Sequence, residues 1–284
     1  MSISASDLHP AGVGLPEDPG AALTEAWRRS HFAAQAAAEV GKSWGEPKDD
    51  DSHSSSAWDD AASALVWRTP RIACRLSLGD LTIDLAGDGG EREIPASGLR
   101  LSQLTDQVRN AATEIGGPPA QEALPAPDLP AHPLATGAMF ESPSEADAAL
   151  EAMYRFTGLL LDRAAGAMPG CEPVRCWPHH FDIAMLGVLA RNGSGAMTRT
   201  VGLGLTPPDA LSERGYWYVS PWSAAPLNAQ SIAELPLGRW VERGGALPMA
   251  VLDVDICLAA SDPAAAAADF LSNATNIMLG GLAQ

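Results

Sequence analysis

Apolar residues recur at helical spacing in four stretches of the chain, and each stretch predicts an amphipathic helix. In the first, residues 21–40, the side chains of Trp27, His31 and Gln35 fall on one face, and Gly41 is expected to end the helix. The other predicted helices span residues 99–115, 144–167 and 264–279.

Short apolar runs between these helices predict strands in two groups. The first group falls at residues 63–68, 71–78, 81–86 and 93–95, and the second at 181–189, 197–205, 216–219 and 247–258. Turn signals such as Gly79-Asp80 suit antiparallel hairpins. The predicted fold class is therefore α+β, with antiparallel sheets flanked by helices. Both halves show helix, strands and helix, so an internal duplication is one interpretation of the pattern.

Proline and glycine concentrate in residues 116–138, where they prevent regular structure. We therefore expect two α+β lobes, residues 21–115 and 139–284, joined by this linker. Residues 1–20 are polar and are expected to be poorly ordered. The Ser/Asp-rich loop at 43–60 contains Trp44 and Trp58, which would expose large apolar surfaces in a free linker, so we expect it to pack against the protein.

The charge balance limits the classes of partner. The 284 residues include 18 Lys and Arg against 35 Asp and Glu, a formal net charge of −17. This acidic balance disfavours nucleic acid and anionic membrane surfaces, which require clustered cations. The chain shows no signal-peptide pattern and no apolar run of about 20 residues, so a cytoplasmic location is expected. Abundant Ala, Gly and Pro, with more Arg than Lys, suggests a bacterial source.

Residues 171–182 hold the densest group of side chains able to bind a metal or move a proton. They comprise two cysteines, two histidines, a tryptophan and a carboxylate. Irregular spacing and the lack of a second cysteine pair disfavour structural zinc. If the following strand reaches back to His179, alternation places His180 and Asp182 on one face. The pair could hold a divalent metal such as zinc together with His53 or His31, or Asp182 could orient His180 as a general base.

Aromatic residues suggest a pocket beside these groups. Trp177, Trp217 and Trp222 are predicted to wall it, with His31 as a further ligand-binding side chain. The alternatives are that the aromatic residues belong to the core and that His53 sits in a solvated loop. Asp253 and Asp255 on the last predicted strand are either solvent-facing or a second carboxylate pair.

Taken together, the early Trp27, His31 and Gln35, the loop with Asp50-Asp51-Ser52-His53, and Trp177-Pro178-His179-His180-Phe181-Asp182 resemble an uncharacterised bacterial domain family. The likeness covers most of the chain loosely. The present chain departs by carrying His179-His180 where small residues are expected. The resemblance implies no activity, but it implies that the early loop and the late motif belong to one fold.

Three functions stay open at this point. The first is a small-molecule enzyme, such as a metal-dependent hydrolase, that uses His180, Asp182 and His53. The second is a non-catalytic protein that binds a small molecule in the same aromatic pocket. The third is an assembly subunit whose tryptophans contact a partner. A small-molecule ligand is the expected partner, and neither nucleic acid nor a membrane is expected.

Overall fold

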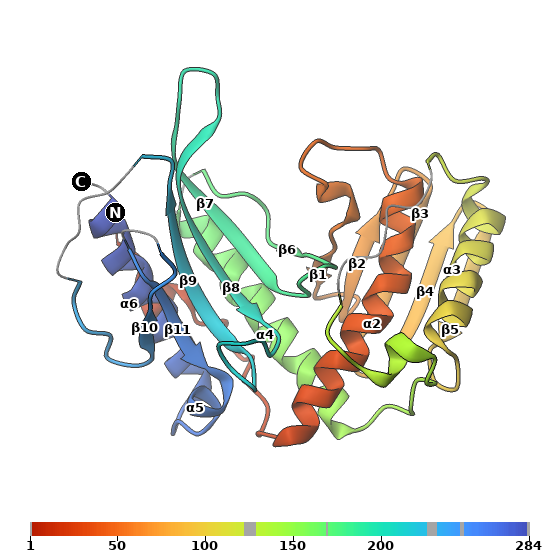
Figure 1. Ribbon diagram of the computed structural model, residues 1–284, viewed down its shortest axis with the longest axis horizontal. Helices are drawn as coiled ribbons and strands as arrows, with labels where there is room; N and C mark the ends of the chain where they lie inside the picture. The colour runs from red at the N-terminus through yellow and green to blue at the C-terminus, as the bar shows by residue number, and fades with distance from the viewer. Residues whose placement is uncertain (1, 122–128, 169, 226–231, 245–246, 283–284) are drawn as a thin grey trace. The chain divides into compact units, whose positions relative to one another are not determined.

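The computed structural model describes residues 2–121, 129–168, 170–225, 232–244 and 247–282 (Figure 1). In this part of the chain it contains six α-helices and two antiparallel sheets, of five and six strands, which confirms the predicted α+β class. The chain divides into two compact units built from separate segments. The first comprises Met1–Asp18, Phe156–Val174 and Ile183–Gln284, and the second Pro19–Arg155 and Arg175–Asp182. The proline-rich residues 116–138 fall inside the second unit, and 122–128 lie outside the described residues.

The second unit is built on the five-stranded sheet, in the order β1-β2-β3-β4-β5. Its strands are β1 (Ala57–Asp59), β2 (Ala64–Arg68), β3 (Ile72–Ser77), β4 (Thr82–Gly87) and β5 (Gly90–Pro95). Alternation along β3 and β4 buries Cys74, Leu76, Ile83 and Leu85 on one face. Helices α2 (Ala21–Trp44) and α3 (Leu101–Gly116) pack together over the sheet (Figure 1).

Helix α2 does not end at Gly41 as the sequence predicts, but continues to Trp44. Gly41 is required for close packing. A Cβ atom there would lie 2.5 Å from the His53 carbonyl oxygen and 3.1 Å from the Trp67 ring. The glycine therefore marks the point where the following loop approaches the helix backbone, and this need outweighs the usual helix-ending tendency of glycine.

The predicted loop at 43–60 is packed only in part: residues 43–44 belong to α2, residues 46–51 are exposed, and residues 52–56 are mostly buried. The Trp44 indole donates to the Gly117 carbonyl at 2.9 Å and is almost fully buried. A short 3-10 helix, Ser52–Ser54, places the Ser54 carbonyl where the Trp67 indole donates to it, also at 2.9 Å. Strand β6 (Arg175–Cys176) joins this region through paired backbone hydrogen bonds between Ser56 and Cys176.

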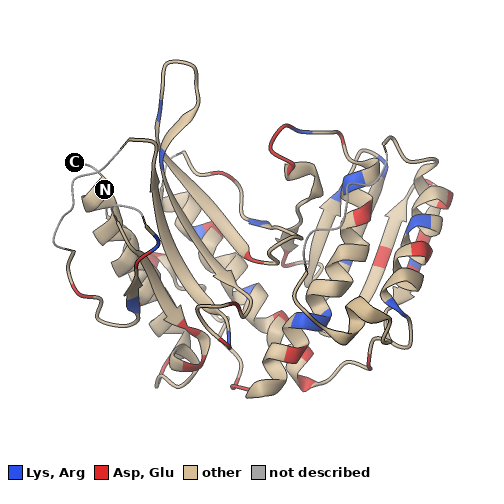
Figure 2. Ribbon diagram, viewed as in Figure 1, with Lys and Arg blue, Asp and Glu red and all other residues tan. Residues whose placement is uncertain are grey.

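Helix α4 (Glu145–Ala167) carries the chain from the second unit into the first. Its first turn is fixed by the Asp147 carboxylate, which accepts from the Ser144 N–H and hydroxyl, both at 2.8 Å. Before it lies a second 3-10 helix, Pro133–Thr136. Lys and Arg residues are interspersed with Asp and Glu residues along the ribbon of both units (Figure 2).

The first unit contributes five strands to the six-stranded sheet, in the order β10-β11-β9-β8-β7. They are β7 (Ile183–Arg191), β8 (Met197–Thr206), β9 (Tyr216–Ser223), β10 (Arg239–Val241) and β11 (Met249–Asp253). Helix α6 (Pro263–Leu282) packs against β8, β9 and β11. The fully buried residues Leu203 and Trp217 share one face of the sheet, and the Trp217 indole donates to the Thr157 hydroxyl of α4.

The N-terminal residues, expected to be poorly ordered, contribute to the core of the first unit. The short helix α1 (Ala5–Leu8) buries Leu8 completely. The Ile3 backbone donates to Asn276 at 2.8 Å and accepts from the Ser272 hydroxyl at 2.7 Å. None of the helices in the described ranges is long and apolar enough to cross a membrane.

The predicted strand at 247–258 is wrong in its second half. Strand β11 ends at Asp253, and the chain turns into the short helix α5 (Val254–Leu258). Asp253 and Asp255 therefore do not share a strand face. Asp253 instead forms a two-point ion pair with the Arg239 guanidinium, at 3.1 Å for both hydrogen bonds.

Candidate ligand-binding site

The motif at 177–182 forms a tight turn in the second unit. The Phe181 N–H donates to the Trp177 carbonyl at 2.6 Å, and the Trp177 N–H donates to the Asp182 carbonyl at 3.2 Å. Phe181 has a φ of 55°, in the left-handed region that bulky residues rarely adopt. Strand β7 begins only at Ile183, so the predicted strand start at residue 181 is wrong. His180 and Asp182 both precede the strand and therefore do not share a strand face.

Contacts from α2 and α4 hold Phe181 in this strained conformation. Its ring is fully buried and stacks on His31, with the centroids 5.3 Å apart and the planes 8° apart. The Tyr154 hydroxyl donates to the Phe181 carbonyl at 2.5 Å and accepts from the Trp27 indole at 2.9 Å. Strained backbone persists only where the surroundings enforce it, and such strain concentrates at functional sites.

Two side chains of α2 donate to one carbonyl of the turn. The His31 Nε2 lies 2.9 Å from the Pro178 oxygen, and because a carbonyl only accepts, Nε2 carries the proton. The Gln35 amide nitrogen donates to the same oxygen and, at 3.3 Å, to the His31 carbonyl. If the oxygen and nitrogen of the Gln35 amide were exchanged, the amide oxygen would face two carbonyl oxygens, and none of the three could donate a proton. The orientation of the amide is therefore fixed.

This orientation leaves one polar atom unsatisfied. Gln35 Oε1 is buried and has no hydrogen-bond partner among the described residues. A buried acceptor without a partner is costly, and native proteins hold few of them.

Burial controls the protonation of the histidines near this turn. Burial lowers the pKa of His31 to about 4; the hydrogen bond to Pro178 opposes this change, and the nearby His180 and His179 add to it. The rings of His179 and His180 have centroids 4.3 Å apart. Burial and His180 also lower the pKa of His179, while Asp51 opposes this and Lys42 adds to it. His31 and His179 are therefore neutral at neutral pH.

A buried lysine extends the polar face of α2. Lys42 lies 11 residues, about three helical turns, after His31, which places both on the same face. Its ammonium pairs with Glu39 at 3.9 Å, and both side chains are largely buried. Burial lowers the pKa of Lys42 and raises that of Glu39, and in each case the partner's charge opposes the change. We refer to His31, Gln35, Lys42, Pro178 and His179 as the α2–turn site.

Other predicted site residues have local roles. The His53 Nδ1 accepts from the Lys48 N–H at 3.3 Å. Burial raises the pKa of Tyr154 and of Cys176, and the charge of the buried Asp182 adds to both increases.

Within the described residues, no group of three or more His, Cys, Asp and Glu side chains is placed to hold a metal ion, so His53, His180 and Asp182 do not form such a group.

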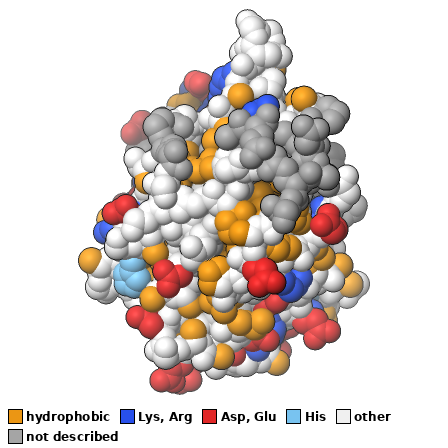
Figure 3. Space-filling view, turned by 90° about the vertical axis from the view of Figure 1, so that its left-hand side faces the viewer, with side chains coloured by type: hydrophobic (Ala, Val, Ile, Leu, Met, Phe, Trp, Pro, Cys, Tyr) orange, Lys and Arg blue, Asp and Glu red, His pale blue; other side chains and the backbone are white. Residues whose placement is uncertain are grey.

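The three tryptophans predicted to wall a pocket have different environments. Trp177 lies on the turn, with its ring centroid 5.9 Å from that of His179. Trp217 is fully buried in the core of the first unit. Trp222, also of the first unit, is 49% exposed. Hydrophobic side chains reach the surface in several places on the face shown in Figure 3.

Sequence reasoning identified His31 and Gln35 on a shared face but missed Lys42, Glu39 and Tyr154. The spacing of Lys42 places it on the same helical face as His31 and Gln35. A lysine on the buried face of an Ala-rich helix is not needed for packing, so its position was a usable signal of a functional role. Nothing in the sequence linked Tyr154 to Phe181. No family model, curated protein or solved structure matches the chain.

Proposed function

We propose that the protein binds a small polar molecule at the α2–turn site. The observation that carries this proposal is the concentration of buried polar side chains on one face of α2, against a turn with strained backbone. Shifted pKa values and strain of this kind are typical of functional sites. A structural role alone would be served at lower cost by apolar side chains.

A ligand panel tests this proposal directly. The wild-type protein is titrated with small carboxylates, amines, amides and phosphate esters, and binding is read from the shift in melting temperature and from calorimetry. We expect one class to bind, and we expect Lys42→Met or His179→Ala to weaken binding by about tenfold or more. Lys48→Met, which changes an exposed lysine of the same unit, is the matched control. Binding that all three variants leave unchanged would place the ligand elsewhere.

A catalytic role is the second candidate, favoured by the two adjacent and exposed imidazoles of His179 and His180. His179 is neutral at neutral pH and would accept a proton as a general base. In the version expected from the sequence, Asp182 orients His180 as the general base; the alternative, in which His180, Asp182 and His53 would hold a metal, is not supported by a metal-binding group in the described part of the chain. The test is hydrolysis of activated esters with and without added zinc. A rate that His179→Ala and His180→Ala leave unchanged would exclude both versions.

A further inference from the structure

We propose that the α2–turn site recognises the amide group of a small molecule, such as a primary amide, a lactam or a urea. The ligand carbonyl would take the place of the Pro178 carbonyl, and the ligand N–H would donate to Gln35 Oε1. This inference rests on the proposed binding function and names the chemistry of its ligand.

The donors of the site already define a carbonyl position. The His31 Nε2 and the Gln35 amide nitrogen converge on the Pro178 oxygen, one from each side chain. A carbonyl oxygen has two lone pairs, so these two donors use its full capacity. Any ligand that displaces Pro178 must therefore present an acceptor with two lone pairs.

The unsatisfied acceptor of the site, Gln35 Oε1, determines which group the ligand must carry beside its carbonyl. Gln35 Oε1 is buried without a partner in the described part of the chain, and the Pro178 carbonyl has no proton to offer it. A ligand with an N–H adjacent to its C=O would satisfy both ends of the Gln35 amide at once, as two amides do when they pair side by side. A carboxylate, ester or ketone offers the acceptor but lacks the donor.

Access to the site requires the turn to move, because Gln35 Oε1 is covered in the structure. Two features favour such a movement. The side chains of His179 and His180 are exposed, so the outer side of the turn faces solvent. The backbone of Phe181 lies in the left-handed region in the observed conformation, and a displaced turn would be free to release this strain. A ligand that binds the displaced form selects it from the ensemble.

Two lactams that differ by one methyl group test the inference. The probe is 2-pyrrolidinone, whose N–H lies beside its C=O, and the control is N-methyl-2-pyrrolidinone, which has no N–H. Binding is followed by calorimetry and by the NMR signals of the Gln35 side-chain amide. We expect the probe to shift these signals and the methylated control to bind at least about tenfold more weakly. Equal binding of the two lactams would overturn the inference.

Variants then locate the interaction. Gln35→Met keeps the length of the side chain but removes both polar ends, and it should abolish the preference for 2-pyrrolidinone. Gln107→Met, on the exposed side of α3, is the matched control and should retain it. A preference that survives in Gln35→Met would overturn the assignment to this site.

The outcomes also separate this inference from the proposed function. If another class of the panel binds in a Lys42-dependent and His179-dependent manner while 2-pyrrolidinone does not bind, the amide inference fails and the binding function stands. If no class binds, both fail.

Discussion

His31 and Phe181 lie face to face, with their ring centroids 5.3 Å apart and their planes 8° apart. The stack joins the middle of α2 to the turn at 177–182, and it keeps the imidazole away from water. The protonation of His31 is therefore coupled to the stability of the fold.

Acid should destabilise the protein through His31. Its pKa is lowered by burial to about 4 from the ordinary 6.5, so the folded state binds this proton less readily than the unfolded chain does. The contribution is complete above pH 6.5 and is lost as the pH falls through the folded value, a change of about 3 kcal/mol in the free energy of unfolding.

Urea denaturation of wild type and His31→Gln across this pH range measures the effect. Gln donates to a carbonyl but does not titrate, so the variant should show a smaller loss of stability in acid. The raised pKa of Glu39, caused by burial, acts in the opposite direction in both proteins and cancels in the comparison. Parallel pH profiles of the two proteins would contradict the prediction.

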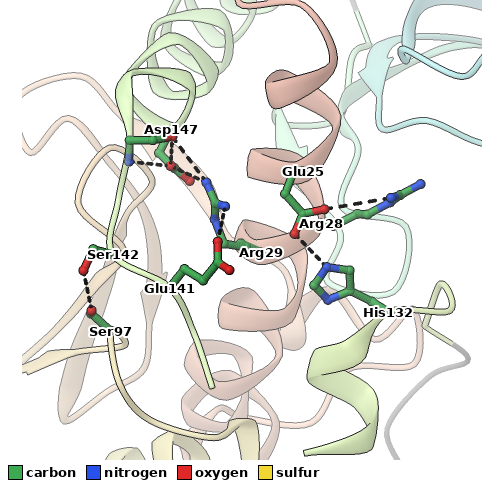
Figure 4. Close-up of polar contacts among 9 residues, drawn as sticks. Glu25, Arg28, Arg29, Ser97, His132, Glu141, Ser142 and Asp147 are labelled. Carbon is green, nitrogen blue, oxygen red and sulfur yellow. Dashed lines mark hydrogen bonds and ion pairs between the residues drawn. The ribbon is translucent and has the colours of Figure 1, made fainter. Parts of the chain in front are cut away.

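Removal of one buried cation should be far more damaging than removal of its neighbour. Arg29 pairs with the fully buried Asp147 at 2.6 Å, whereas Arg28 forms an exposed pair with Glu25 at 3.9 Å (Figure 4). Arg29→Met leaves the Asp147 charge buried without its cation, and we expect a loss of about 3–5 kcal/mol. Arg28→Met is the matched control, with an expected change within about 0.5 kcal/mol.

Urea denaturation of both arginine variants is the measurement. Equal effects would show that the Arg29–Asp147 pair contributes no more than a surface pair.

Two glycines in helices should respond to alanine with opposite signs. At Gly41 the new methyl group would lie 2.5 Å from the His53 carbonyl, and we expect Gly41→Ala to cost about 1–3 kcal/mol. At Gly166 no atom outside the adjacent residues and the backbone of the helix itself lies within 4 Å of the new group, so Gly166→Ala should stabilise α4 by up to about 1 kcal/mol. Melting temperatures of the two variants test the contrast, and stabilisation by both would refute it.

The four cysteines should differ in reactivity. Burial raises the pKa of the thiols of Cys74, Cys176 and Cys257, which are completely or almost completely enclosed. Cys171 is only partly buried. A thiol reagent applied to the native protein should therefore label Cys171 first, and labelling should spread to all four only on unfolding. Cys171→Ser should remove the fast phase, and a fast phase that persists would contradict the assignment.

Much of the secondary structure follows from local patterns, because helices and strands bury faces with periods of 3.6 and 2 residues. The failures lie where a distant segment decides the conformation. Gly41 remains helical because the loop around His53 packs against it, and residue 181 leaves the strand pattern because His31 and Tyr154 hold it in a turn. Residues 254–258 have strand-like composition but form a helix, for which sequence periodicity gave no signal.

The candidate site was predictable only in part. The shared face of His31 and Gln35 follows from helical spacing alone. The Pro178 carbonyl that joins them lies 143 residues after Gln35, and no property of proline in the sequence marks its carbonyl as an acceptor. Backbone acceptors of this kind become visible only when the fold is known.

The return of residues 175–182 to the second unit sets an order for folding during synthesis. The acceptor for His31 and Gln35 is made more than 140 residues after these side chains. Until then, the donors of these side chains lack their native partner, and the second unit cannot complete its core. During that interval α2 can already pack against α3 and the strands of its sheet, so only the contacts of its His31 and Gln35 side chains with the turn wait for the late segment.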